Sequence, residues 1–114
     1  MTRIYKLLDR PAWNEAVALG VFRGSEADAA DGFIHFSDAG QAQETARRHF
    51  TDSPDLLLLT VDAESLGDAL RWEPSRDGAL FPHLYAALPV AAVIEIRALE
   101  PGGDGVPRLG TLEP

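Results

Sequence analysis

Two short segments, "FIHFS" and "FPHLY", carry the residues best suited to chemistry in this sequence. Alternate side chains of a strand point to the same face of its sheet. Each segment would therefore present an aromatic ring, an imidazole and a hydroxyl group together: Phe33, His35 and Ser37 in the first, and Phe81, His83 and Tyr85 in the second. If the two strands are neighbours, these groups line one apolar-walled pocket, which is the composition expected of a small-molecule site.

We therefore predict that His35 and His83 are catalytic groups that act as acid, base or stacking partner, and that Ser37 and Tyr85 contact the substrate. The structural alternative is that each imidazole packs on a sheet and bonds to backbone. His49 has the spacing of an ordinary helix boundary residue. A zinc site built from the three histidines has no short ligand spacing to support it, so no metal is expected. Ser37 lacks the glycine-flanked elbow of a serine nucleophile.

Charged side chains supply further candidates for substrate binding. Arg71 and Glu73 share one face of "LRWEP", where they are either an acid with its orienting cation or a solvated ion pair. Arg48 could bind a phosphate or lie on a solvated helix face. Lys6, in "IYK", would hold a phosphate or form a Schiff base, whereas without a ligand it must find a carboxylate or extend to solvent.

The hydropathy pattern predicts the elements that position these residues. Asp9 as N-cap, Pro11 in the first turn and Gly20 as terminator bound a helix, with Trp13 in its apolar stripe. The run "DLLLLTVD" is apolar on both faces and indicates a central strand. The predicted strands are residues 3–8, 33–37, 56–62, 69–73 and 93–99, and the predicted helices are residues 10–19 and 39–50.

These elements predict one α+β domain over residues 1–99, because helices come early, strands dominate afterwards and the two do not alternate. The segment "SEADAADG" is expected to be an acidic loop. Pro82 indicates an edge strand or a strand start. Residues 100–114 are rich in glycine and proline and are predicted to be a C-terminal tail.

Composition narrows the class of protein. A formal net charge of -8 disfavours nonspecific attraction to nucleic acid or anionic membranes, so a small-molecule partner is expected. The absence of cysteine excludes disulfides and thiolate zinc sites. No apolar run is long enough to span a bilayer, and we expect a cytoplasmic protein. The sequence makes no prediction of oligomeric state.

The motifs "IYK", "GFIHFS", "LRWEP" and "FPHLY", in this order, resemble a bacterial family of uncharacterised proteins, domain-of-unknown-function family 952, up to about residue 99. That family in turn resembles the ADP-ribosyltransferase fold, which includes poly-ADP-ribose polymerases, bacterial toxins and RNA 2′-phosphotransferases. The resemblance implies a mixed, mostly antiparallel sheet with two helices in the N-terminal half. It also implies a substrate such as NAD, ADP-ribose or a related phosphorylated nucleoside; NAD would enter as substrate, and no bound cofactor is expected.

Single positions can be compared with this superfamily. Lys6 stands where the superfamily has a histidine that contacts the adenosine ribose of NAD, and His35 stands where the polymerases have a tyrosine that stacks on nicotinamide. The position of the glutamate that orients the ribose 2′-hydroxyl falls near His83, and no glutamate is there. As in the phosphotransferases, Arg48 and Arg71 would then hold a phosphate.

Because two of these three positions differ, the resemblance supports the fold more strongly than the reaction. Two functions follow. The first is a transferase acting on a nucleotide-like substrate, and the alternative is a non-catalytic module that binds a small nucleotide-like ligand.

Overall fold

The apolar strand β4 (Leu56–Asp62) organises the protein, which we describe from a computed structural model of residues 1–114. It is the middle strand of an antiparallel sheet with the order β1–β4–β8, in which its neighbours are β1 (Arg3–Asp9) and β8 (Val93–Leu99). Its leucines are buried on both faces of the sheet. The central position predicted from the double-sided apolar run is confirmed.

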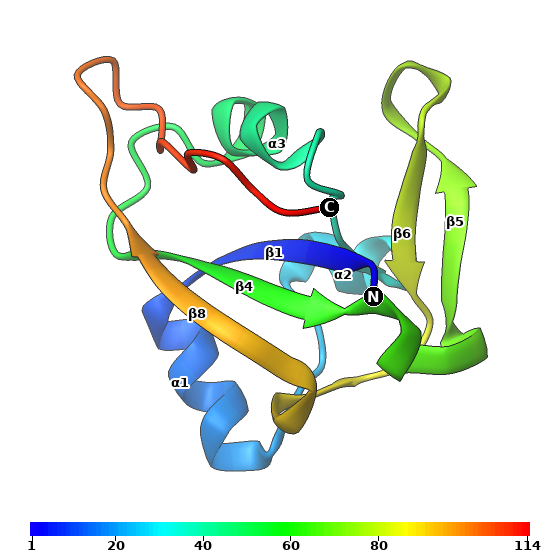
Figure 1. Cartoon of the computed structure of the whole chain (residues 1–114). Coiled ribbons are helices and arrows are strands. Elements are labelled where there is room, and N and C mark those ends of the chain that lie inside the picture. The colour runs from blue at the N-terminus through cyan, green and yellow to red at the C-terminus, as the bar shows by residue number, and fades with distance from the viewer.

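Two core layers lie on opposite faces of this sheet (Figure 1). Helix α1 (Arg10–Leu19) covers one face, where Trp13 and Ala16 pack into the larger apolar cluster. Helix α3 (Ala42–His49) and the C-terminal segment cover the other face. The molecule is thus an α+β domain with exclusively antiparallel strand pairs, which confirms the predicted fold class.

A second sheet stands beside the first and carries both histidine segments (Figure 1). Its order is β3–β6–β5, and a separate two-stranded pair joins β2 to β7. The remaining bounds are β2 (Val21–Phe22), α2 (Glu26–Asp31), β3 (Ile34–His35), η1 (Ala63–Ala69), β5 (Leu70–Pro74), η2 (Arg76–Gly78), β6 (Leu80–Leu84), β7 (Leu88–Pro89) and η3 (Val90–Ala92), where η denotes a 3₁₀ helix.

Helix α1 forms where its capping residues predicted it. The Asp9 carboxylate accepts a hydrogen bond from Ala12 N at 2.8 Å, and Gly20 ends the helix with a left-handed φ of 85°. Trp13 is buried, with 7% of its surface exposed. Val17, one turn after Trp13, is 52% exposed and lies on the solvent side of the helix.

The acidic segment predicted as a loop forms a third helix, α2, so the expectation of two helices was wrong. Its N-terminus has a capping box: Ser25 Oγ accepts from Asp28 N, and the Asp28 carboxylate accepts from Ser25 N. The helix has six residues, too few for an apolar period to be visible in the sequence. The helix predicted at residues 39–50 is shorter, because turns occupy the residues before Ala42.

Strand β3 contains two residues instead of the predicted 33–37, because the chain passes from one sheet to the other there. Ser37 N donates to Tyr5 O at 2.9 Å, and Tyr5 N donates to Ser37 O at 2.8 Å, so the segment bridges to β1 directly after β3. Figure 1 shows β3's neighbour β6 standing at the side of the β1–β4–β8 sheet. The chain therefore passes from the β3–β6–β5 sheet to the edge of the β1–β4–β8 sheet directly after β3.

Pro82 lies in the central strand β6, so its predicted edge or start position was wrong. Its carbonyl oxygen accepts from Phe36 N at 3.0 Å, just beyond the last paired residue of β3. The backbone amide that proline lacks would point to the same side, where β3 has already ended. A proline is tolerated there because it removes at most one bond at the end of a short ladder.

The segment predicted as a tail, residues 100–114, packs against α3 and β1. Pro107 and Leu109 are buried, and Gln43 donates to Pro107 O at 2.7 Å and accepts from Leu109 N at 3.0 Å. The Tyr5 hydroxyl donates to Glu113 O. No helix in the structure has the length and apolar character needed to cross a membrane.

We expect Trp13→Ala to lower the free energy of unfolding by about 3 to 5 kcal/mol, because it leaves a cavity between α1 and the sheet. The control is Val17→Ala on the exposed side of the same helix, with an expected change within about 0.5 kcal/mol. Both values come from chemical denaturation. A loss below about 1 kcal/mol for Trp13→Ala would contradict the packing described here.

Candidate functional site

A cleft of about 970 Å³ lies where α2, α3 and the β5–β6 hairpin meet. Both histidine segments contribute to its wall, and both predicted catalytic histidines line it. Their positions are directly opposite in the β3–β6 register, and their ring centroids are 5.7 Å apart. The prediction that His35 and His83 share one pocket is confirmed by this geometry.

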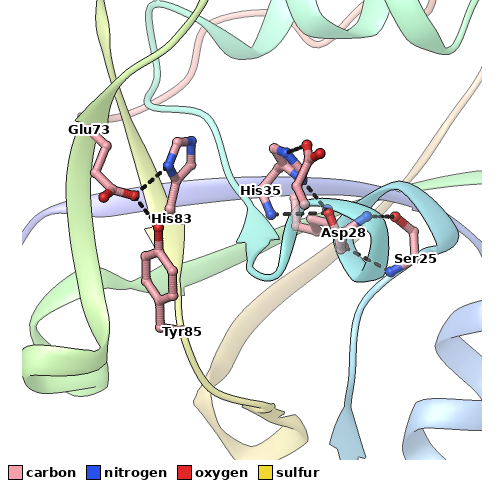
Figure 2. A network of polar contacts seen from close by, with 8 residues as sticks. Ser25, Asp28, His35, Glu73, His83 and Tyr85 are labelled. Carbon is pink, nitrogen blue, oxygen red and sulfur yellow. Dashed lines mark hydrogen bonds and ion pairs between the residues drawn. The ribbon is translucent and has the colours of Figure 1, made fainter.

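The buried carboxylate of Asp28 is the polar centre of the α2 side of the cleft (Figure 2). Asp28 is 2% exposed and accepts hydrogen bonds from Lys6 Nζ at 3.0 and 3.1 Å and from Ser25 N at 2.8 Å. It also accepts from the backbone N of His35 at 3.1 Å and lies 2.6 Å from His35 Nδ1. One carboxylate thus joins β1, the start of α2 and β3.

These contacts keep Asp28 ionised. Burial alone would raise the pKa of Asp28, but the charge of Lys6 and the hydrogen bonds from His35 and Ser25 outweigh it and lower the pKa below its usual value. Burial lowers the pKa of Lys6, and the neighbouring Asp28 charge opposes that effect. Since the carboxylate neutralises the buried ammonium, Lys6 has the structural partner that the sequence required in the absence of a ligand.

His35 is held between two carboxylates. Its Nδ1 contacts Asp28, and its Nε2 lies 2.8 Å from Oδ2 of Asp31 at the exposed end of α2. Both ring nitrogens of His35 are therefore engaged by carboxylates of α2.

His83 has a different environment, although it lies opposite His35. Its Nδ1 is 2.9 Å from Oε1 of Glu73, and the Tyr85 hydroxyl donates to the same oxygen at 2.7 Å (Figure 2). The hydrogen bond from Tyr85, then that from His83, lowers the pKa of Glu73, while the pKa of Tyr85 is raised by the same contact. Ionised Glu73 accepts from Nδ1, which leaves the lone pair of the neutral ring on Nε2.

Phe33 fixes the position of the His83 ring. The two rings are stacked with centroids 4.0 Å apart, and Phe33 also lies 4.7 Å from His35 and 5.3 Å from Tyr85. His83 is 4% exposed as a result, and its Nε2 makes no hydrogen bond within the protein. Phe33 thus packs against both imidazoles, whereas Phe81, the aromatic residue predicted beside His83, lies against the Arg76 guanidinium.

The far side of the cleft carries hydroxyl groups and an arginine. Ser37 Oγ and Thr45 Oγ1 are 2.9 Å apart, and Thr45 Oγ1 donates to Gln41 O at 3.2 Å. The guanidinium of Arg76 lies 4.9 Å from the ring centroid of Phe81, with both terminal nitrogens 3.4 Å from Thr45 Oγ1.

The structure brings five of the eight predicted site residues to the cleft wall: Lys6, His35, Ser37, Arg48 and His83. Glu73 and Tyr85 lie behind His83 instead. Arg71 does not pair with Glu73, and its guanidinium lies 4.9 Å from the ring centroid of Tyr85. The predicted Arg71–Glu73 pair was therefore wrong, whereas the functional roles of all eight residues stay predictions.

Sequence reasoning missed Asp28, although two signals pointed to it. "SEAD" has the serine-to-acid spacing of a capping box, and a lysine in an apolar strand demands a buried carboxylate. Arg76 was also missed, and no local pattern distinguishes it from the other arginines. Its role depends on which of them find acidic partners in the folded chain.

The geometry supports acid–base chemistry and anion binding. His83 offers Nε2, which no other group in the protein binds, and Arg76 offers guanidinium N–H donors. No group of three or more histidine, aspartate or glutamate side chains is arranged to hold a metal ion.

Comparisons with known proteins identify the same family that the order of the four sequence motifs resembles. The family described as protein of unknown function (DUF952) matches residues 7–96. The chain belongs to this family. A crystal structure of protein CC0527 from Caulobacter crescentus is similar, with a TM-score of 0.94, 53% sequence identity and coverage of 96% of each chain. A solution NMR structure of CC0527 has a TM-score of 0.87 and 54% identity, and the similarity covers 96% of this chain and 95% of that one.

No curated protein matches the chain. Family membership and the structures of CC0527 therefore establish the fold and the ancestry of this DUF952 protein, and the geometry of the cleft carries the functional argument.

We expect Asp28→Asn to lower the free energy of unfolding by about 3 to 5 kcal/mol at neutral pH, because it leaves Lys6 without its charged partner. The pKa of Asp28 is lowered in the folded state, so its stabilising contribution is complete above the unfolded value of about 3.9 and is lost as pH falls through the folded value. The difference between wild type and variant should therefore shrink below about pH 4 in urea denaturation.

Asp31→Asn is the matched control, because it makes the same chemical change at an exposed carboxylate on the same helix. Its expected effect is below about 1 kcal/mol. Equal effects of the two substitutions would show that the buried position of Asp28 has no energetic importance.

Proposed function

We propose that this protein is an enzyme acting on a small phosphorylated nucleoside, in which His83 is the general base and the cleft holds the substrate. The observation that carries this proposal is the state of the His83 ring. Its Nδ1 is fixed by Glu73, whereas its Nε2 makes no hydrogen bond in a side chain that is 4% exposed and lines the cleft.

No buried side-chain nitrogen or oxygen in the structure lacks a hydrogen-bond partner, so the unpartnered Nε2 of His83 is accessible from the cleft. Here the carboxylate of Glu73 selects the tautomer, and the Tyr85 hydroxyl and the Phe33 ring hold the carboxylate and the imidazole in place. A base oriented by a third group is the arrangement used to take a proton from a substrate hydroxyl or from water. The positions of Glu73, Tyr85 and Phe33 around the His83 ring support such a role for His83.

The cleft favours a small, anionic and partly aromatic ligand. Its volume of about 970 Å³ is at the upper end of the usual range for small-molecule sites. Phe36 and Phe81 supply aromatic surface on the cleft wall, and Arg76 supplies positive charge in a protein with a net charge of -8. A ligand made of a nucleobase, a sugar and a phosphate would use all of these features.

The remote resemblance of the family to the ADP-ribosyltransferase fold favours NAD, ADP-ribose or a related phosphorylated nucleoside as the substrate class. In this proposal His83 replaces the glutamate of the transferases as proton acceptor. The second candidate function is a non-catalytic module that binds the same ligands. The engaged ammonium of Lys6 favours it, because this lysine is held by Asp28 and is not free to attack a carbonyl group.

The test combines binding and turnover. NAD, ADP-ribose and 2′-phosphorylated oligonucleotides are screened by thermal shift, where a ligand at a hundred times its Kd should stabilise the fold by about 2.7 kcal/mol. Turnover of each ligand that binds is followed by phosphorus NMR and chromatography. We expect His83→Ala to reduce turnover by about 10²- to 10⁴-fold, the usual contribution of a general base, with a much smaller effect on binding.

Glu73→Gln should reduce turnover less than His83→Ala, because it weakens the orientation of the ring without removing it. Glu95→Gln on the exposed strand β8 is the matched control and should leave turnover unchanged. Binding with no turnover in the wild type would support the binding module. Turnover that His83→Ala leaves intact would contradict the proposed base.

A further inference from the structure

We infer that the cleft contains an anion subsite, built from Arg76, Thr45 and Ser37, that binds the phosphate group of the substrate. This inference rests on the proposed function and assigns the phosphate to one corner of the cleft. It differs from the expectation based on sequence, in which Arg48 and Arg71 were to hold the phosphate.

The first argument is the pairing of the basic residues. Three basic side chains other than histidine line the cleft: Lys6, Arg48 and Arg76. Lys6 Nζ is 3.0 Å from an oxygen of Asp28, and Arg48 Nε is 2.8 Å from an oxygen of Glu44. Arg76 makes no ion pair, although acidic residues outnumber basic ones by 18 to 10 in this chain. It is therefore the one of the three whose charge has no counterion.

The second argument is the immediate environment of the Arg76 guanidinium. It is half-buried, with one face against the Phe81 ring, so water reaches it less freely than a surface arginine. Its two terminal nitrogens share a single neutral oxygen, Thr45 Oγ1, at 3.4 Å each. Both N···O distances are long for hydrogen bonds. The paired N–H groups of a guanidinium match two oxygens of an anion, so one hydroxyl oxygen leaves their donor capacity unused.

The third argument is the hydroxyl pair beside that fork. Thr45 donates its proton to Gln41 O, so Ser37 Oγ donates to Thr45 Oγ1 in the unliganded arrangement. Ser37 Oγ has no other partner within the protein and can turn its proton toward an anion that approaches Arg76. A guanidinium with a neighbouring hydroxyl donor is a common chemical solution for phosphate binding.

The position of this subsite fits the role given to His83. Phe81 and His83 are two residues apart on β6 and face the same way, so the surface of Phe81 on which Arg76 lies is about 7 Å from the base along the strand. A phosphate ester of a sugar spans a gap of this size. The anionic end of the substrate would then bind at Arg76 while a sugar hydroxyl reaches His83 Nε2.

The carboxylates of the cleft do not prevent anion binding in this corner. All three lie on α2: Asp28 is paired with Lys6, Asp31 contacts His35, and Glu26 makes no ion pair. Arg76 and Thr45 lie on the hairpin and on α3, on other walls of the cleft. Charge is thus separated between the two sides of the cleft.

The test uses inorganic phosphate, ribose 5-phosphate and ribose as probes of the intact protein. Two-dimensional proton–nitrogen NMR should show phosphate-dependent shifts at Arg76 Nε–H and at the Thr45 amide. Ribose 5-phosphate should bind at least tenfold more tightly than ribose. Arg76→Met keeps the apolar stem on Phe81 and removes the charge, and we expect it to abolish that tenfold preference. Thr45→Val should weaken it while preserving side-chain shape.

Arg23→Met is the matched control, because Arg23 is exposed, makes no ion pair and lies outside this cleft. It should retain the tenfold preference. Equal losses in Arg76→Met and Arg23→Met, or phosphate-dependent shifts that bypass Arg76 and Thr45, would overturn the subsite.

His83→Ala separates this inference from the proposed catalysis. The variant should keep the preference for ribose 5-phosphate, since the base is not part of the subsite. If His83→Ala left turnover intact but Arg76→Met abolished phosphate binding, the subsite would stand without the proposed base. If His83→Ala abolished turnover but Arg76→Met left phosphate binding intact, the proposed base would be supported and the subsite would be contradicted.

Discussion

The buried carboxylate of Asp28 is the interaction on which the rest of the site depends. It neutralises Lys6 inside the apolar layer beneath α1, caps the helix that contains it through Ser25, and binds both the backbone and the ring of His35. An unpaired charge at this depth would be strongly unfavourable, so the strand, the helix and the histidine must adopt their positions together. One buried carboxylate therefore links the α2 wall of the cleft to β1 and β3.

The two histidines show how environment assigns different chemistry to the same side chain. Both ring nitrogens of His35 contact carboxylates, whereas His83 contacts a carboxylate only at Nδ1 and leaves Nε2 toward the cleft. Their rings are only 5.7 Å apart, and Phe33 contacts both. The two imidazoles therefore present different groups to a substrate in the same cleft.

Much of the fold followed from short-range patterns. The caps around α1 and the double-sided apolar run of β4 led to correct bounds because each signal lies within the element it defines. The repeated layout of the histidine segments also predicted the shared cleft, since strand alternation fixes which side chains face together. Helix α2 escaped this reasoning because it is held by polar bonds at its N-terminus and has too few residues for periodicity.

The sequence by itself determined the fold class, the central strand, the first helix and, within each histidine segment, which side chains share a face; that the two segments pair was decided by the tertiary structure. Only the tertiary structure decided which charges are neutralised. Lys6 meets Asp28 across 22 residues of chain, while Arg76 meets a hydroxyl and an aromatic ring instead of a carboxylate. Local spacing carries no information about such contacts, because they depend on how α2, α3 and the β5–β6 hairpin close around one cleft.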